Sequence, residues 1–388
     1  MVLDMKPSFP AALLAAVLLA TPAIAQEPAT QPTTQAATRP ADATPIETLL
    51  YDSADAFEQL TDPQKEAMAQ GPRAAEADCN AAVAIVETFG PLLDRAAELD
   101  LDAARITGIE AGATDLPDYV AGINPLVSAA LVGLAPQLAE DGPALDLAAN
   151  RAVAVAAMLR PLTQTSSTSL WFLAANADSV LRQTMGGRAL SLPAEPMNAM
   201  ATLPPLRDFD KITGEEGREL AKLLRESDEL PAFLVQLAES KEIPEAELAT
   251  WRADWADADR KAELIEEYEL YFDVEVELAK LTDEPEAMER FLKEWEAGHE
   301  NESLWLSRQS LMSPREAYSL QFRQRAIADL FAVVAAGAAE EDLPAAVDAA
   351  KTVTGGGAIQ VRGGGDGRLL LVAEVPLGDV PAILPVGP

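Results

Sequence analysis

The sequence predicts a mainly α-helical protein, a multi-helix bundle or array that carries a small C-terminal β-hairpin. Two observations lead to this prediction. Apolar residues recur at helical spacing through most of residues 46–350, in segments rich in Ala, Leu and Glu. After them, "TVTGGGAIQVRGGGDGRLLLVAEVP" (352–376) replaces the helical pattern with glycine runs and short alternating apolar stretches, which indicate strands joined by turns.

The first 45 residues are expected to lie outside this fold. Lys6 precedes the apolar run "AALLAAVLLA", and small residues provide a cleavage point near Ala25, so residues 1–25 predict a signal peptide. The run is shorter than the roughly 20 residues that cross a bilayer, and no later uncharged stretch reaches that length. We therefore expect an exported protein, periplasmic or extracellular after cleavage, without a transmembrane segment in the mature chain. The Pro- and Thr-rich residues 26–45 predict a disordered linker.

Residues 46–190 predict an N-terminal helical part. Pro63 fits the first turn of a helix, where its missing N–H costs nothing, and the run "TQTSSTS" supplies an N-cap for the segment that follows it. The predicted helices are one from Ile46 to Leu60, one from Pro63, one within 74–99 that Gly90 and Pro91 interrupt, and three within 118–186.

An acidic helical part is predicted over residues 205–350. Prolines between residues 187 and 214 mark a boundary, which we place near 190–205. Trp251, Trp255, Ala258, Ala262 and Ile265 follow helical spacing and predict one apolar stripe that faces a core.

The segment "FDVEVEL", residues 272–278, gives conflicting signals. Its apolar and acidic residues alternate as in a strand, but it stands among strong helix formers without turn residues on either side. We favour a helix, and the pattern alone leaves a strand open.

Residues 351–388 predict a C-terminal β-hairpin and tail, and the glycines within 352–376 are interpreted as turns. A phosphate-binding loop needs a Lys after its glycines and a helix after the loop, and a dinucleotide-binding loop also needs a helix there. Here "AIQVR" and "RLLLVAEV" flank "GGGDG", a pattern typical of a β-hairpin whose glycines can adopt positive φ.

The formal net charge of −34 limits the classes of partner. Nucleic acids and anionic lipid surfaces would be repelled, whereas a basic protein partner or cations remain candidates. With a single cysteine, Cys79, the chain forms no intrachain disulfide. The favoured interpretation of Cys79 is a small buried side chain, and a reactive or intermolecular thiol is the alternative.

Catalytic and metal motifs are not found in the sequence. His299 is the only histidine, so sites that need two imidazoles are excluded, and we interpret it as a solvated residue at a helix end. We predict no catalytic, metal-binding or cofactor-binding residue and no cofactor. Glu263, Glu266 and Glu267 form an acidic patch that we expect to face solvent or a basic partner.

Two stretches, 117–185 and 317–347 with the glycine-rich strands after them, resemble a loose group of exported, helical bacterial proteins of unknown function. The resemblance implies an Ala/Leu-rich helical body and a helix followed by a short strand pair, and it transfers no function. Our leading hypothesis is therefore a non-enzymatic scaffold or protein-interaction module. The alternatives are a carboxylate-dependent hydrolase of an extracytoplasmic polymer and a low-affinity cation binder. The sequence leaves the substrate, partner and oligomeric state open.

Overall fold

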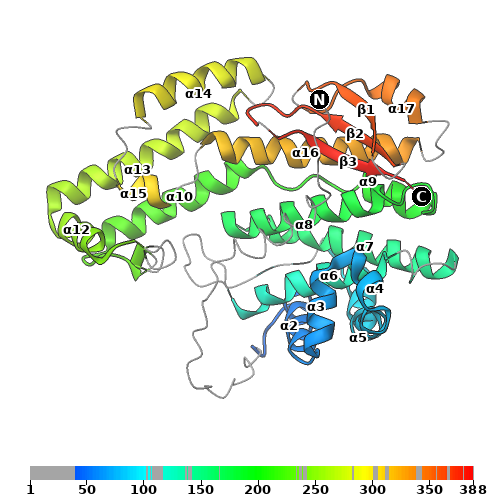
Figure 1. The fold of residues 1–388 in the computed structure, drawn as a ribbon. Coiled ribbons are helices and arrows are strands. Elements are labelled where there is room, and N and C mark those ends of the chain that lie inside the picture. Colours follow the sequence, from blue (N-terminus) through cyan, green and yellow to red (C-terminus); the bar gives the residue numbers. More distant parts are fainter. Residues whose placement is uncertain are drawn as a thin grey trace.

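The computed structural model confirms that the protein is mainly α-helical. It describes residues 40–387 except 102–103, 105, 107–116, 136–137, 139–141, 166, 233, 236–237, 239–242, 282–283, 300–304, 311–313, 338–342, 355, 365–367 and 379. Within this part there are 15 α-helices and one three-stranded sheet (Figure 1). The predicted signal peptide, residues 1–25, and residues 26–39 of the predicted linker lie outside the described residues. Among the helices searched, none is long and apolar enough to cross a membrane.

The first helices begin within one residue of the predicted positions, and side chains cap them. In the box of Thr44 and Glu47, each residue's side chain accepts a hydrogen bond from the other's backbone N–H, and Thr61 precedes the next helix. The elements of this region are α2 (Pro45–Glu58), α3 (Asp62–Ala69), the 3-10 turn η1 (Gly71–Arg73), α4 (Ala74–Ala77) and α5 (Cys79–Ala97).

Two sequence predictions for α5 are wrong. The helix continues through Gly90 and Pro91, which were expected to interrupt it. Burial of Phe89 and Leu93 in the core offsets the loss of the hydrogen bond that Pro91 cannot donate. Gly90, which has no side chain, leaves room for the Arg151 guanidinium. The favoured burial of Cys79 is also wrong: the thiol is exposed, because Cys79 is the first residue of α5.

The central helices form a stack in which α16, α8, α7 and α5 follow one another (Figure 1). Ser167 caps α8 by accepting a hydrogen bond from the Leu170 N–H, as the "TQTSSTS" run predicted. Small residues allow close approach: Ala149, Ala152 and Ala156 of α7 are fully buried. This region comprises the 3-10 helix η2 (Asp118–Gly122), α6 (Ile123–Gly133), α7 (Gly142–Leu162), α8 (Thr168–Gly186) and α9 (Ala194–Ala201).

The acidic part is also helical. Residues 272–278 belong to α13, so the helix interpretation of "FDVEVEL" is confirmed. The helices are α10 (Phe209–Glu226), α12 (Glu245–Ala256), α13 (Ala258–Ala279), α14 (Pro285–His299), α15 (Trp305–Ser310), α16 (Pro314–Ala336) and α17 (Leu343–Ala350).

The predicted apolar stripe from Trp251 to Ile265 is interrupted. Asp257 is extended and caps α13 by accepting hydrogen bonds from the Asp259 and Arg260 N–H groups, so two helices replace one. Trp251, Trp255 and Ile265 are buried, as predicted, whereas Ala258 and Ala262 are exposed.

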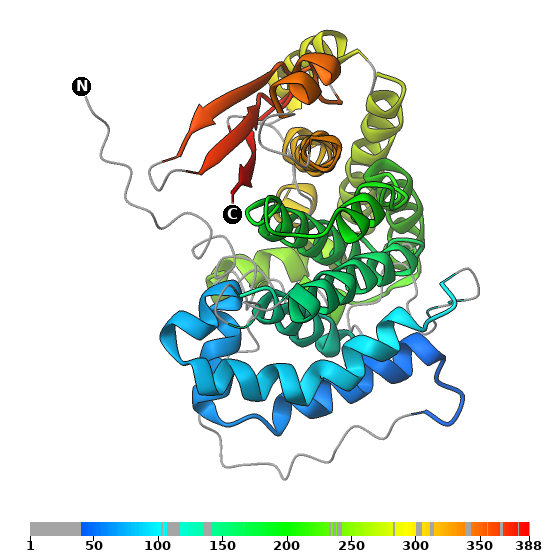
Figure 2. The ribbon, with the colours of Figure 1, turned by 90° about the vertical axis from the view of Figure 1, so that its right-hand side faces the viewer.

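The C-terminal glycine-rich segment forms an antiparallel sheet. The predicted hairpin pairs β1 (Ile359–Gly363) with β2 (Leu369–Ala373), and Val361 lies opposite Leu371. A third strand, β3 (Ala382–Val386), pairs with β2 in a region where the sequence analysis expected only a tail. Burial of Ala382, Leu384 and Val386 against α16 and α8 explains this strand. Figure 2 shows the sheet on one side of α16, which is seen there almost end-on.

Buried apolar side chains form two separate clusters. The larger one, here called the body, includes α2–α9, α14, α16 and the sheet. It also contains Leu206, Phe209 and Ile212, so it extends across the boundary predicted near residues 190–205. The smaller one, the arm, consists of these residues of α10, α12, α13, α15 and the segment before α12: Ala221, Leu224, Leu234, Ala238, Leu248, Trp251, Trp255, Leu264, Ile265, Tyr268, Phe272, Trp305 and Leu306.

Candidate ligand-binding site

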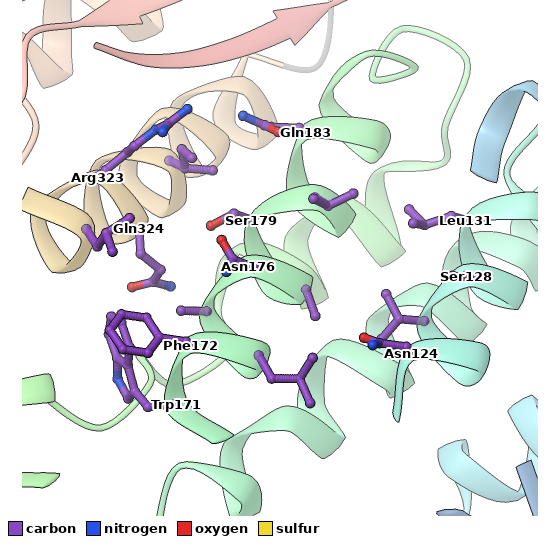
Figure 3. Close-up of a pocket in the computed structure, with 17 residues that line it drawn as sticks. Asn124, Ser128, Leu131, Trp171, Phe172, Asn176, Ser179, Gln183, Arg323 and Gln324 are labelled. Carbon is purple, nitrogen blue, oxygen red and sulfur yellow. The ribbon is translucent and has the colours of Figure 1, made fainter. Parts of the chain in front are cut away.

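A pocket in the body lies along α8, between α6 and α16. Figure 3 shows the side chains of α8 between those of α16 on one side and those of α6 on the other. Most of the lining is apolar. The apolar residues are Val127 and Leu131 of α6, Trp171, Phe172, Leu173, Ala175, Ala177 and Val180 of α8, and Leu320 and Ile327 of α16.

A polar stripe on α8 crosses this apolar lining. Asn176, Ser179 and Gln183 follow the i, i+3, i+7 spacing that places side chains on one face of a helix. All three are half-buried. The Gln183 amide donates a hydrogen bond to the Ile383 carbonyl of β3 at 3.0 Å, so the sheet fixes this side chain. Asn124 and Ser128 add polar groups from α6.

Arg323 of α16 supplies a positive charge to the pocket. It lies at the same end of the pocket as Gln183 (Figure 3). Arg323 is half-buried and forms no hydrogen bond or ion pair with the residues that the structure describes. Burial lowers the pKa of its guanidinium, because desolvation disfavours the charged form and no carboxylate compensates for it.

A buried ion cluster holds α8 between α7 and α16. The fully buried carboxylate of Asp178 accepts hydrogen bonds from Arg160 of α7 at 2.7 Å, from Arg182 at 2.8 Å and from Gln324 of α16 at 3.2 Å. Gln324 also lines the pocket, so one side chain connects the cluster with the pocket wall. Pairs of this kind fix geometry, because a displaced partner leaves a buried charge unpaired.

The electrostatics of this cluster favour a charged Asp178. Burial alone would raise the pKa of Asp178, but the charges and hydrogen bonds of Arg160 and Arg182 hold it below its ordinary range. Burial in turn lowers the pKa of Arg160, an effect that Asp178 partly offsets. Two guanidinium groups and one carboxylate leave an excess of one positive charge directly behind the pocket.

The pocket is small and has no acidic lining. Its volume is about 80 Å³. A water molecule needs about 10–15 Å³ on this scale, so the space corresponds to about six waters, or a ligand of roughly six to ten non-hydrogen atoms. Among the described residues that line the pocket, none is Asp or Glu. The arrangement can therefore hold a small, largely apolar molecule, and it provides no pair of carboxylates for acid–base catalysis.

A second, shallower depression lies between α14 and the sheet and does contain carboxylates. Glu286, Glu289 and Glu374 line it together with backbone near Gly356. Burial by itself would raise the pKa of Glu289. The hydrogen bonds and charges of Arg315 and Lys293 together lower it by more, so the pKa lies below its ordinary value. A general acid in a glycosidase needs the opposite shift.

The acidic residues singled out from the sequence lie elsewhere. Glu263, Glu266 and Glu267 occupy one outer face of α13 in the arm, where Glu263 pairs with Arg260 at 2.6 Å. Glu263 and Glu266 are exposed and Glu267 is half-buried. His299 is the last residue of α14, in agreement with a helix end. Within the described part of the chain, no group of three or more His, Cys, Asp or Glu side chains is placed to hold a metal ion.

Sequence reasoning missed the pocket residues. A signal was present: α8 carries Asn176, Ser179 and Gln183 on one face of an otherwise Ala- and Leu-rich helix, and Arg323 with Gln324 interrupts the apolar positions of α16. These patterns became informative only once the structure placed the two helices side by side.

No family model, curated protein or solved structure matches this chain.

Proposed function

We propose that this protein is a non-enzymatic binding protein that holds a small, largely apolar molecule in the pocket between α6, α8 and α16. The observation that supports the proposal is the lining itself, with apolar walls from three helices and a few polar side chains on one stripe. This combination is characteristic of small-molecule sites, in which apolar area gives affinity and a few polar groups set orientation. Export, predicted from residues 1–25, remains part of the proposal.

The rigid support of the pocket favours binding. The ion cluster of Asp178 fixes α8 against α7 and α16, and Gln183 is fixed by β3. A preformed site loses less conformational entropy when a ligand enters. Each ligand methylene that becomes buried then contributes about 0.8 kcal/mol.

The carboxylate-dependent hydrolase is the weaker proposal. It requires two facing acids of which one is desolvated enough to stay protonated. The α8 pocket has no acid in its described lining, and the carboxylate of Glu289 in the shallower depression is held by Arg315.

Calorimetric titration of the chain with 1-octanol, a neutral ligand with nine non-hydrogen atoms, tests the proposed function. The Val180→Trp variant places a large side chain in the pocket and should abolish the heat of binding. The matched control is Val276→Trp, at a position of α13 that is 47% exposed and does not line the pocket, which should bind 1-octanol as the unchanged protein does.

Circular dichroism and thermal unfolding show whether each Trp variant is folded. If Val180→Trp unfolds, Ser128→Phe blocks the same pocket from α6. Absence of 1-octanol binding by the unchanged protein, or full binding by a folded Val180→Trp, would refute the proposed function.

A further inference from the structure

We infer that the natural ligand is a medium-chain monocarboxylate whose carboxylate pairs with Arg323 and whose hydrocarbon chain lies along the apolar face of α8. This inference rests on the proposed function, and it specifies the chemical class of the ligand.

The first argument is the position of Arg323. A guanidinium removed from water is usually paired, since its desolvation otherwise costs free energy. Arg323 lines the pocket and extends toward the end where Gln183 lies (Figure 3), and no described carboxylate reaches it. A ligand carboxylate would supply the missing partner through two parallel N–H···O hydrogen bonds.

The second argument is the local sign of the charge. The chain as a whole has a formal net charge of −34, yet the described lining of this pocket contains one arginine and no acid. Behind α8, Arg160 and Arg182 exceed Asp178 by one positive charge. The field inside the pocket is therefore suited to an anion, in contrast to the outer surface.

The third argument concerns the kind of anion. Arg323 is the only charged side chain among the described lining residues, so it balances a single negative charge. A phosphate monoester near pH 7 carries close to two charges, and only one of them could pair directly with Arg323, because Arg160 and Arg182 do not line the pocket and are already paired with Asp178. The volume of about 80 Å³ fits a chain of medium length. Octanoate, with ten non-hydrogen atoms, satisfies both conditions.

The test compares three ligands with the same alkyl chain: octanoate, 1-octanol and octyltrimethylammonium. The unchanged protein should bind octanoate at least about 10-fold more tightly than 1-octanol, because charge-assisted hydrogen bonds are about twice as strong as neutral ones. Octyltrimethylammonium should bind more weakly than 1-octanol. Calorimetry at one pH and one salt concentration gives the three dissociation constants.

The variant Arg323→Gln removes the charge and keeps a shorter polar side chain at the same position. It should weaken octanoate binding about 10-fold and leave 1-octanol binding within about 2-fold. Arg362→Gln is the control, since Arg362 is exposed on β1, bonds only to Gln360 among the described residues and changes the net charge equally.

The outcomes separate this inference from the proposed function. If 1-octanol binds and Val180→Trp blocks it, but octanoate shows no preference or Arg323→Gln retains the preference, the carboxylate inference is refuted and the binding function stands. If no ligand of the series binds the unchanged protein, the binding function itself fails. If Arg362→Gln loses as much octanoate affinity as Arg323→Gln, the loss results from the change in net charge, and the inference is also refuted.

Discussion

The body and the arm are both helical, but they fill their interiors differently. Helices of the body approach through alanines such as Ala152 and Ala156 of α7, and a polar cluster around Asp178 is buried among them. The arm is packed with large aromatic side chains, and Trp251 and Trp305 stack with their ring centroids 4.6 Å apart.

This difference shows where a helical protein can keep a binding site. Close helix contacts through small residues leave room beside them, and ion pairs hold the walls of that room in place. In the arm, aromatic rings occupy the space between α10, α12, α13 and α15, and charge is confined to the outside. The body therefore contains a pocket between its helices, whereas the described interior of the arm is filled with aromatic side chains.

Removal of the buried carboxylate should have the largest effect. The Asp178→Ala variant leaves Arg160 and Arg182 buried without their partner, so the free energy of unfolding should fall by about 3–5 kcal/mol. Glu245→Ala in the arm breaks the exposed pair with Arg252 and should cost at most about 1 kcal/mol. Urea unfolding measures both values, and similar losses would contradict the contrast between body and arm.

A pair of glycines on α10 tests the tight packing where the arm begins. A Cβ at Gly217 would lie 2.2 Å from the ring of Phe272, so Gly217→Ala should destabilise the protein by about 1–3 kcal/mol. A Cβ at Gly214, one turn earlier, would meet only the end of the Arg218 side chain at 4.0 Å, so Gly214→Ala should stabilise the helix by about 0.5–1 kcal/mol. In thermal unfolding, Gly217→Ala should lower the melting temperature and Gly214→Ala should raise it. Two stabilising substitutions would show that the ring moves aside.

Lowering the pH should show a smaller contribution to stability from Asp208, at the start of α10. Burial raises the pKa of Asp208, but the charge and hydrogen bond of Arg325 and the contact with Lys211 hold it below 3.8. A lowered folded-state pKa stabilises the protein above pH 3.8 and ceases to do so as pH falls through the folded value. The free energy of unfolding of the unchanged protein should exceed that of Asp208→Asn by about 1 kcal/mol at pH 5–7, and this difference should disappear below about pH 4. A constant gap at every pH would refute the assignment.

The acidic face of α13 is expected to influence stability least. Changing Glu263, Glu266 and Glu267 to Gln together should alter the free energy of unfolding by about 0.5 kcal/mol or less, since exposed charges contribute little. If this face binds a basic protein, the same variant should lose that partner in a pull-down at low salt. Retention of the partner at low salt would exclude this patch from the interface.

The sequence predicted those parts of the fold that local chemistry determines. Pro63 marked the first turn of a helix, the run before α8 supplied a cap at Ser167, and strong helix formers around residues 272–278 outweighed the alternation of that segment. Each of these features depends on groups within a few residues of one another. The glycine run also lies between two strands, as expected: Gly363 is the last residue of β1 and Gly364 follows it, while residues 365–367 lie outside the described part.

Features that depend on distant contacts were missed. The passage of α5 through Pro91 depends on burial against other helices, and β3 forms because β2 and α16 are beside it. The pocket is the clearest example, since Gln183 and Arg323 are separated by much of the chain and meet only when α8 packs on α16. No pattern within either helix predicts that these two side chains line the same pocket.

The hydrogen bond from Gln183 to Ile383 spans 200 residues, and the Leu190 N–H donates to the Gly387 carbonyl nearby. At synthesis rates of roughly 5–20 residues per second, α8 exists for roughly 10–40 s before β3 is made. During this interval one side of the helix has no permanent neighbour. Among the strands and helices described here that contact α8, β3 is synthesised last, and its contact fixes the end of α8 at which Gln183 and Arg323 lie.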